Sequence, residues 1–334
     1  MTGVQTCALP IYGGHFTKYD PANVFVAERL QKDGVRTMGA ASHWYFQFWA
    51  GLTQGMDVWD ISAKPEDGQG DNDTSITSAQ LSDAAIRLLK QPKNTDGRFF
   101  LWLHYFDPHA QYMPHEGAPD FLEGGKGGVA ATRALYDGEV WFTDREVGRV
   151  VDFVASQPWG ARTAIIVTSD HGEAFGEHDM SWHGVDLWEC LVRVPLIVHV
   201  PGAEPKRVAA KRSHIDLAPT ILSLMHVKAE PGELSGESLL PDVLGKKPPA
   251  ERDVLVDMPV GPYTLMRKAL ITGPAPGTKL VWYGAKSWAV FDLAADPDEK
   301  NDLSADPSRL DPLVEALSQK RATLKEIDVP PLPP

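Results

Sequence analysis

The sequence predicts an α/β fold: a mostly parallel sheet with helices on both faces, followed by a small antiparallel subdomain. Up to about residue 247, short and wholly apolar runs alternate with segments of helical periodicity, which is typical of parallel strands buried on both faces. Beyond residue 248 the apolar runs are shorter and turn residues separate them. We therefore expect a large domain over residues 12–247 and a small α+β subdomain over residues 248–334.

The first elements follow from the spacing of apolar residues. These recur at helical spacing until Gly34, which ends a helix before a strand at residues 35–38. A second helix is expected over residues 77–89, where Thr77 or Ser78 can serve as the N-cap.

Three apolar runs predict the buried strands of the sheet. They lie at residues 99–105, 163–169 and 195–200, and each is apolar on both faces. Helices are expected over residues 132–156 and immediately after Asp216, which can cap the second of them. Because these strands and helices alternate along the chain, the sequence predicts a parallel sheet with helices on both faces.

The small subdomain is predicted from four short strands and a closing helix. The strands are expected at residues 254–256, 265–271, 279–283 and 289–293. The helix is expected over residues 312–325, before a proline-rich end.

Composition excludes several functional classes. The formal net charge of -13 argues against a nucleic-acid partner, because such partners require a basic surface. No apolar run reaches the roughly 18 residues that a transmembrane helix needs. Cys7 and Cys190 are the only cysteines, which excludes a disulfide framework, and Cys190 is expected to be a buried helix residue.

The beginning of the chain looks foreign to the fold. Residues 2–11, TGVQTCALPI, resemble the translation of a sequencing-adapter oligonucleotide. We therefore expect residues 1–11 to be an artefact and the protein sequence to begin near Tyr12, so that a segment upstream of it is missing.

Polar residues follow two of the predicted strands, and in parallel α/β sheets ligands bind beyond the carboxyl ends of strands. Asp170 and His171 follow the strand at 163–169 directly, and Gly172 permits a sharp turn that lets both side chains face one point. A carboxylate and a neutral imidazole together suit a divalent cation. The alternative is a solvated loop in which Asp170 caps a helix, but this leaves His171 and His183 unexplained.

The second loop is Asp107-Pro108-His109. Pro108 restricts the backbone before His109, which helps to aim its imidazole at a ligand. Such a histidine can donate a proton to a leaving group or hold an anionic oxygen. The alternative is a histidine that is hydrogen-bonded within the loop. His104, inside the strand, is interpreted as a hydrogen-bonded core histidine and not as a ligand.

Six segments in order resemble the sulfatases of the alkaline phosphatase superfamily. They are FFLWLHYFDPHAQY (99–112), YDGEVWFTDREVGRVVDF (136–153), TAIIVTSDHGEAFGEH (163–178), RVPLIVHVPG (193–202), HIDLAPTIL (214–222) and VFDLAADPDEKNDLS (290–304). Residues 13–42 are similar to the segment that follows the nucleophile in this family. Each motif alone is weak, but six in family order are specific, and the resemblance covers nearly everything after Tyr12.

The resemblance implies a role for each candidate residue. Asp170 and His171 resemble the second pair of ligands of one divalent metal ion, usually calcium, with magnesium and manganese as alternatives. His109 matches the histidine that contacts the oxyanion or leaving group. His183 falls where relatives place a residue that binds the transferred group.

Two parts of the family pattern do not occur in the sequence: the first pair of aspartate ligands and the Cys/Ser-x-Pro-x-Arg nucleophile motif. In the complete relatives that cysteine or serine becomes formylglycine, whose hydrate attacks the ester. We therefore expect the chain as written to be inactive toward its ester.

Two alternatives to a sulfatase stay open. The same fold could hydrolyse phosphonate or phosphate esters, including diesters, or it could serve a binding protein without catalysis. A small-molecule or carbohydrate sulfate ester is the expected partner, and residues 44–59 and 114–129 could line its pocket. The resemblance favours a periplasmic or secreted location, and the sequence does not indicate an oligomeric state.

Overall fold

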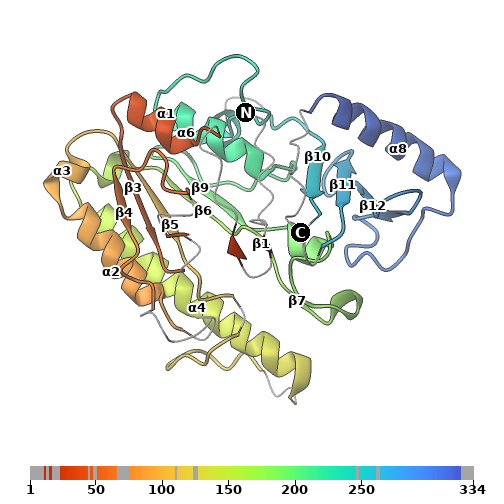
Figure 1. Ribbon diagram of the computed structural model, residues 1–334, viewed down its shortest axis with the longest axis horizontal. Helices are drawn as coiled ribbons and strands as arrows, with labels where there is room; N and C mark the ends of the chain where they lie inside the picture. The colour runs from red at the N-terminus through yellow and green to blue at the C-terminus, as the bar shows by residue number, and fades with distance from the viewer. Residues whose placement is uncertain are drawn as a thin grey trace.

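The computed structural model describes residues 11–12, 15–16, 23–43, 46–47, 51–65, 75–109, 111–122, 127–245, 248–260 and 264–324. Figure 1 shows a sheet with helices on both faces, and beside it a smaller antiparallel sheet with one long helix. The predicted fold class is confirmed. The expected artefact at residues 1–11 lies outside the described residues except for Ile11, which belongs to the short strand β1 (Ile11–Tyr12) paired with β2 (His15–Phe16).

Three parallel strands form one sheet. β3 (Arg36–Ala41) lies between β4 (Val58–Asp60) and β5 (Phe99–His104), with Met38 opposite both Val58 and Leu101. β4 was not predicted, because the segment around it was assigned to a substrate-lining loop. Trp59 of β4 packs so closely against β3 that a Cβ on Gly39 would lie 2.3 Å from its ring.

The remaining strands correct one prediction. β6 (Ile165–Thr168) and β9 (Leu196–His199) are antiparallel, whereas the sequence predicted parallel strands at both positions. The connection between them contains no long helix that could carry the chain back along the sheet, and a parallel pair requires such a crossover. It contains β7 (Ala174–Phe175), the 3-10 turn η4 (Glu177–Asp179), β8 (Ser181–Trp182) and α5 (Glu189–Val192).

Two pairs of helices cover the two faces of the sheet (Figure 1). α2 (Ser78–Leu89) and α4 (Gly128–Ala155) cover one face, where Leu81 and Val150 belong to the main apolar core with Met38. α1 (Val26–Lys32) and α6 (Leu217–Leu224) cover the other, where Leu30 packs with Leu222. The shorter helical segments are α3 (Pro92–Thr95), η3 (Gly160–Arg162), η5 (His214–Asp216) and α7 (Leu240–Val243).

The C-terminal sheet is an antiparallel meander in chain order. Its strands are β10 (Val254–Met258), β11 (Arg267–Thr272), β12 (Thr278–Trp282) and β13 (Trp288–Asp292), close to the four predicted segments. α8 (Pro307–Ala322) begins five residues before the predicted start. Asp306 caps it by accepting a hydrogen bond from the backbone N of Ser308 (2.9 Å), and Pro307 occupies the first helical position, which suits proline.

The division at residues 247 and 248 stays a prediction. Within the described part of the chain, no helix combines the length and the apolar character needed to cross a lipid bilayer.

Candidate active site

The loop that follows β5 begins with a structural residue. The Asp107 carboxylate is buried and accepts hydrogen bonds from the backbone N of Thr77 (2.7 Å), the hydroxyl of Thr77 (2.6 Å) and the backbone N of Ser78 (2.8 Å). Thr77 is the N-cap residue of α2, as predicted, but its side chain makes no capping hydrogen bond. Asp107 therefore caps α2 from a distant part of the chain, and this contact fixes the loop that presents His109.

His109 lies at the end of a stack of rings. Its backbone N donates to the carbonyl of Phe106 (2.9 Å), and its ring stacks on the Phe106 ring at a centroid distance of 4.6 Å. Phe106 in turn stacks on His43 at 4.1 Å. Burial, together with His104 and His109, lowers the pKa of His43 to about 3, so this ring is neutral at physiological pH.

Three predicted site histidines lie together, although two distant parts of the chain supply them. The rings of His171 and His183 stack with centroids 3.9 Å apart, and the His183 ring meets the edge of His109 at 5.0 Å. Asp170 adjoins this cluster, since its Oδ2 lies 3.7 Å from Nε2 of His171. The structure therefore brings all four residues together, while their chemical roles stay predictions.

Asp170 is held in its charged form. Burial by itself raises the pKa of this carboxyl, but His171 and His104 outweigh that effect, and the net pKa is below the ordinary value. The backbone N of His171 also donates to Asp170 Oδ1 (3.0 Å). An ionised carboxylate is the form that a cation would bind.

Glu173 is a site residue that the sequence did not single out. It is 9% exposed, and both of its carboxylate oxygens lie near Nδ1 of His183, at 3.2 and 3.1 Å. Burial opposes its ionisation, yet the hydrogen bond with His183 prevails and lowers the pKa of Glu173. Burial and this carboxylate together raise the pKa of the neighbouring Tyr112. The position of Glu173 directly after Asp170, His171 and Gly172 was the feature of the sequence that could have identified it as a site residue.

His214 is a second residue that the sequence did not assign to the site. It precedes α6, and its Nε2 lies 3.3 Å from the hydroxyl of Thr168 at the end of β6. Burial lowers its pKa, while the charge of Asp170 acts in the opposite direction. A neutral imidazole therefore lies beside the carboxylate of Asp170.

His104 differs from its interpretation as a hydrogen-bonded core residue. Its ring packs against Phe46 at a centroid distance of 4.4 Å, but Nδ1 is buried and has no hydrogen-bond partner among the residues that the structure describes. Burial lowers the pKa of His104 to about 4, which keeps it neutral. The rings of Phe46 and Trp102, which pack against the His104 ring, offer no hydrogen-bond acceptor.

The backbone of the histidine loop is tightly constrained. Gly172 donates its N–H to the carbonyl of Leu191 (2.7 Å), and a Cβ at Gly172 would lie 2.0 Å from the carbonyl oxygen of Cys190. Glycine is therefore required here because α5 approaches the backbone closely. The sequence instead suggested a sharp turn as the reason for this glycine. Cys190 itself lies in α5, as predicted, and is half-buried; burial raises the pKa of its thiol to about 11.

The hairpin after Gly172 contains bulky residues in the left-handed region. His178, Asp179 and Trp182 have φ values of +53°, +58° and +70°, which L-residues adopt at an energetic cost. Trp182 is also 61% exposed, directly before His183. Such strain is frequent near functional sites.

The loop that follows His109 is anchored on α4 by a buried carboxylate. Glu139 accepts a hydrogen bond from the backbone N of Met113 (2.6 Å) and lies 2.7 Å from Nε2 of His115. Part of the predicted pocket lining, residues 114–129, is therefore fixed to the helix. Trp59, at the end of the other predicted lining segment, is half-buried in the sheet and stacks on Trp102 at 5.7 Å.

Asp170 and His171 fit half of a metal site. Their donor atoms, one carboxylate oxygen and one imidazole nitrogen, are close enough to share a cation. Among the described residues, however, no group of three or more His, Cys, Asp or Glu side chains is arranged to hold a metal ion.

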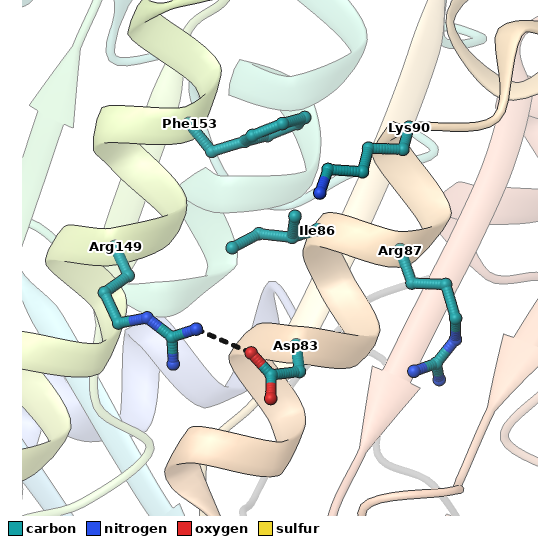
Figure 2. Close-up of a pocket in the computed structure, with 6 residues that line it drawn as sticks. All are labelled: Asp83, Ile86, Arg87, Lys90, Arg149 and Phe153. Atoms are coloured by element: carbon teal, nitrogen blue, oxygen red, sulfur yellow. Dashed lines mark hydrogen bonds and ion pairs between the residues drawn. The ribbon is translucent and has the colours of Figure 1, made fainter.

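A surface hollow between α2 and α4 has no connection with these residues (Figure 2). Asp107 caps the first turn of α2, whereas the hollow is lined by Asp83, Ile86, Arg87 and Lys90 from the later part of α2 and its end, and by Arg149 and Phe153 of α4. Its arginines are paired, because Arg149 binds Asp83 (2.6 Å) and Arg87 binds Asp60 (2.7 Å), and Lys90 Nζ lies over the Phe153 ring, 5.7 Å from its centroid. This hollow is a seam between two helices.

The comparisons with known proteins decide the family. The Sulfatase family model matches residues 11–227. The chain belongs to the sulfatase family. A second family model, N-sulphoglucosamine sulphohydrolase, C-terminal, matches residues 176–326.

Individual relatives of this sulfatase-family chain agree with that result. It is 28% identical over 199 residues to an uncharacterized sulfatase, YidJ, of Escherichia coli, covering 51% of this chain and 40% of the relative. It is 29% identical over 211 residues to a choline-sulfatase of Rhizobium meliloti, covering 63% and 38%. The chain thus spans about two-fifths of the length of these two relatives.

Solved structures show the same fold. A protein solved with its substrate D-glucosamine-2-N,6-O-disulfate has a TM-score of 0.70 at 18% identity, covering 92% of this chain and 83% of that one. A phosphonate monoester hydrolase of Agrobacterium radiobacter has a TM-score of 0.70 at 17% identity, covering 94% and 85%. The fold is therefore shared by enzymes that act on different esters.

Proposed function

We propose that this chain contributes the ester-binding half of a metal-dependent sulfatase, with Asp170 and His171 as ligands of one divalent cation. Calcium is the proposed ion, with magnesium and manganese as alternatives. The observation that supports this most is the meeting of His109, His171 and His183 beside the ionised Asp170.

Each side chain has a distinct task in this proposal. When bound, the cation offsets negative charge on the oxygens of the ester. Glu173 accepts a hydrogen bond from Nδ1 of His183 and so fixes the orientation of the His183 ring beside the ester. His109, fixed against Phe106, donates a hydrogen bond or a proton to the leaving-group oxygen.

The nucleophile of this family, formylglycine, forms in a Cys/Ser-x-Pro-x-Arg motif that the sequence does not contain. We therefore propose that the chain as given binds a sulfate ester without turning it over. Turnover of 4-nitrophenyl sulfate above the uncatalysed rate would contradict this part of the proposal.

Calorimetric titration with CaCl₂ tests the metal ligands. Asp170→Ala and His171→Ala are each expected to weaken calcium binding by more than the roughly 10- to 100-fold that loss of a residue behind a metal ligand costs. Asp298→Ala is the matched control, because Asp298 is an exposed carboxylate that pairs with Lys300 (2.7 Å). Equal calcium affinity in the Asp170 variant and the control would refute the assignment.

Titration with 4-nitrophenyl sulfate in saturating calcium tests the histidines. His183→Ala is expected to weaken binding of the ester while leaving calcium binding unchanged, because His183 is proposed to contact the ester alone. Loss of both affinities together would instead place His183 among the metal ligands.

A phosphonate or phosphate ester hydrolase is the second candidate, favoured by the likeness to the phosphonate monoester hydrolase fold. Both ester types present tetrahedral oxygens to the same histidines. Tighter binding of a 4-nitrophenyl phosphonate than of the sulfate would favour this candidate.

If the chain is part of a sulfatase, a carbohydrate sulfate is the proposed substrate class, supported by the sugar sulfate in the similar solved structure. A third candidate is a non-catalytic binding protein.

A further inference from the structure

A buried lysine of the C-terminal sheet contacts the segment that bears the candidate site. Lys279 in β12 is fully buried, and its Nζ lies 3.0 Å from Glu189 Oε1 and 2.8 Å from Glu299 Oε1. Glu299 also accepts a hydrogen bond from the backbone N of Glu189 (2.6 Å). A buried ammonium group is strongly destabilising unless carboxylates pair with it, so the three side chains must keep their relative positions.

Glu189 is the first residue of α5, and α5 contacts the histidine loop. The backbone N of Gly172 donates to the carbonyl of Leu191, and the Cys190 carbonyl leaves no room for a Cβ at Gly172. The carbonyl of Gly172 in turn lies 2.8 Å from Nδ1 of His171. A continuous series of contacts therefore runs from Lys279 to the His171 ring.

Apolar packing also holds this segment on the C-terminal sheet. Leu187 and Trp188 belong to the same core as Phe291, and the Trp188 ring meets the edge of the Phe291 ring at a centroid distance of 5.7 Å. Hydrophobic contact is non-directional, so it brings the two parts together without fixing their register. Charge-assisted hydrogen bonds are directional and can fix it.

We propose that Lys279 is a positioning residue of the candidate site, which acts through Glu189 and α5 to fix Gly172 and the ring of His171. The C-terminal sheet then completes the site instead of only packing beside it. The proposal rests on the proposed function for the importance of His171, but its contacts and its test require neither a metal ion nor an ester.

Native-state hydrogen exchange of the Gly172 amide tests the proposal in Lys279→Met. Lys268→Met is the matched control, because Lys268 is 6% exposed and its Nζ lies 2.7 Å from Asp257, in a pair that joins β11 to β10. Both variants should lose global stability. Only Lys279→Met should lose Gly172 protection beyond that of the β11–β12 amides, by roughly 5- to 150-fold.

Glu189→Ala provides a second variant should Lys279→Met fail to fold. It removes the direct ion pair between Lys279 and α5 but leaves Lys279 paired with Glu299, which still accepts from the backbone N of residue 189, so the buried charge keeps a partner. We expect a selective loss at Gly172 that is smaller than in Lys279→Met, with a shift of the His171 ring resonances in NMR spectra. Unchanged Gly172 protection in Glu189→Ala, or equal loss in the two lysine variants, would show that Lys279 is only structural.

The two proposals can fail separately. If calcium does not bind the wild-type chain, the metal assignment is wrong, and the exchange result at Gly172 still decides the role of Lys279.

Discussion

The imidazole rings of His171 and His183 stack on one another, with centroids 3.9 Å apart and an angle of 24° between their planes. Each ring has its own carboxylate: Asp170 adjoins His171, and Glu173 adjoins His183. The Nδ1 atoms of the two rings have different acceptors, the Gly172 carbonyl for His171 (2.8 Å) and the Glu173 carboxylate for His183 (3.1 Å), so the two tautomers are set separately.

Glu173 is expected to set the tautomer of His183. Its carboxylate accepts a hydrogen bond from Nδ1, which leaves Nε2 unprotonated. In Glu173→Ala we expect the proton to move to Nε2, which ¹⁵N NMR of the imidazole nitrogens detects. Glu204→Ala, an exposed carboxylate, is the control. An unchanged ¹⁵N pattern in the Glu173 variant would contradict the assignment.

Asp107 is expected to stabilise the fold through the N-terminus of α2. Asp107→Ala leaves two buried backbone N–H groups and one hydroxyl without their acceptor, and should lower the free energy of unfolding by about 2–3 kcal/mol. Urea denaturation measures the loss. Asp306→Ala removes the exposed cap of α8 and should cost about 1 kcal/mol. If Asp107→Ala lowers the free energy of unfolding no more than Asp306→Ala does, the buried cap stabilises the fold no more than the exposed one.

His43 is expected to make the protein less stable in acid. Its pKa is about 3 in the folded state and 6.5 in a model compound, so the unfolded chain binds a proton that the folded chain does not. Stability from the neutral ring is fully present above pH 6.5 and is lost as the pH falls toward 3, with a slope of about 1.4 kcal/mol per pH unit for one proton.

His43→Phe should reduce that slope between pH 4 and 6, measured from urea unfolding curves at several pH values. His226→Phe is the control, because His226 is exposed. Parallel pH profiles for wild type and His43→Phe would contradict the prediction.

Trp182 is expected to store backbone strain. At φ +70° the Cβ atom of Trp182 crowds the neighbouring backbone carbonyl, whereas glycine has no Cβ atom and avoids this contact. Trp182→Gly should therefore be more stable than Trp182→Ala by about 1 kcal/mol, the reverse of the usual order in regular structure. Thermal unfolding of the two variants tests this, and an alanine variant as stable as the glycine variant would show that the loop relaxes.

The apolar runs and their alternation predicted most of the fold, because local periodicity alone decides which segments form strands and helices. The direction of β9 could not be predicted in this way, since its sequence fits either orientation and the pairing depends on whether the connecting segment forms a crossover helix. The start of α8 was missed because Asp306-Pro307 and Asp311-Pro312 are equally suitable as a cap and first helical residue, and only the structure shows that Asp306 caps the helix.

By itself, the sequence predicted the family and proposed four site residues, because Asp170, His171 and His109 follow predicted strands and His183 falls at a position that the family resemblance assigns. Only the tertiary structure showed that Glu173 holds His183, that Asp107 caps α2, and that Lys279 pairs with Glu189. The physical reason is that hydrogen bonds and buried ion pairs depend on distances between segments far apart in the chain, which residue spacing does not encode.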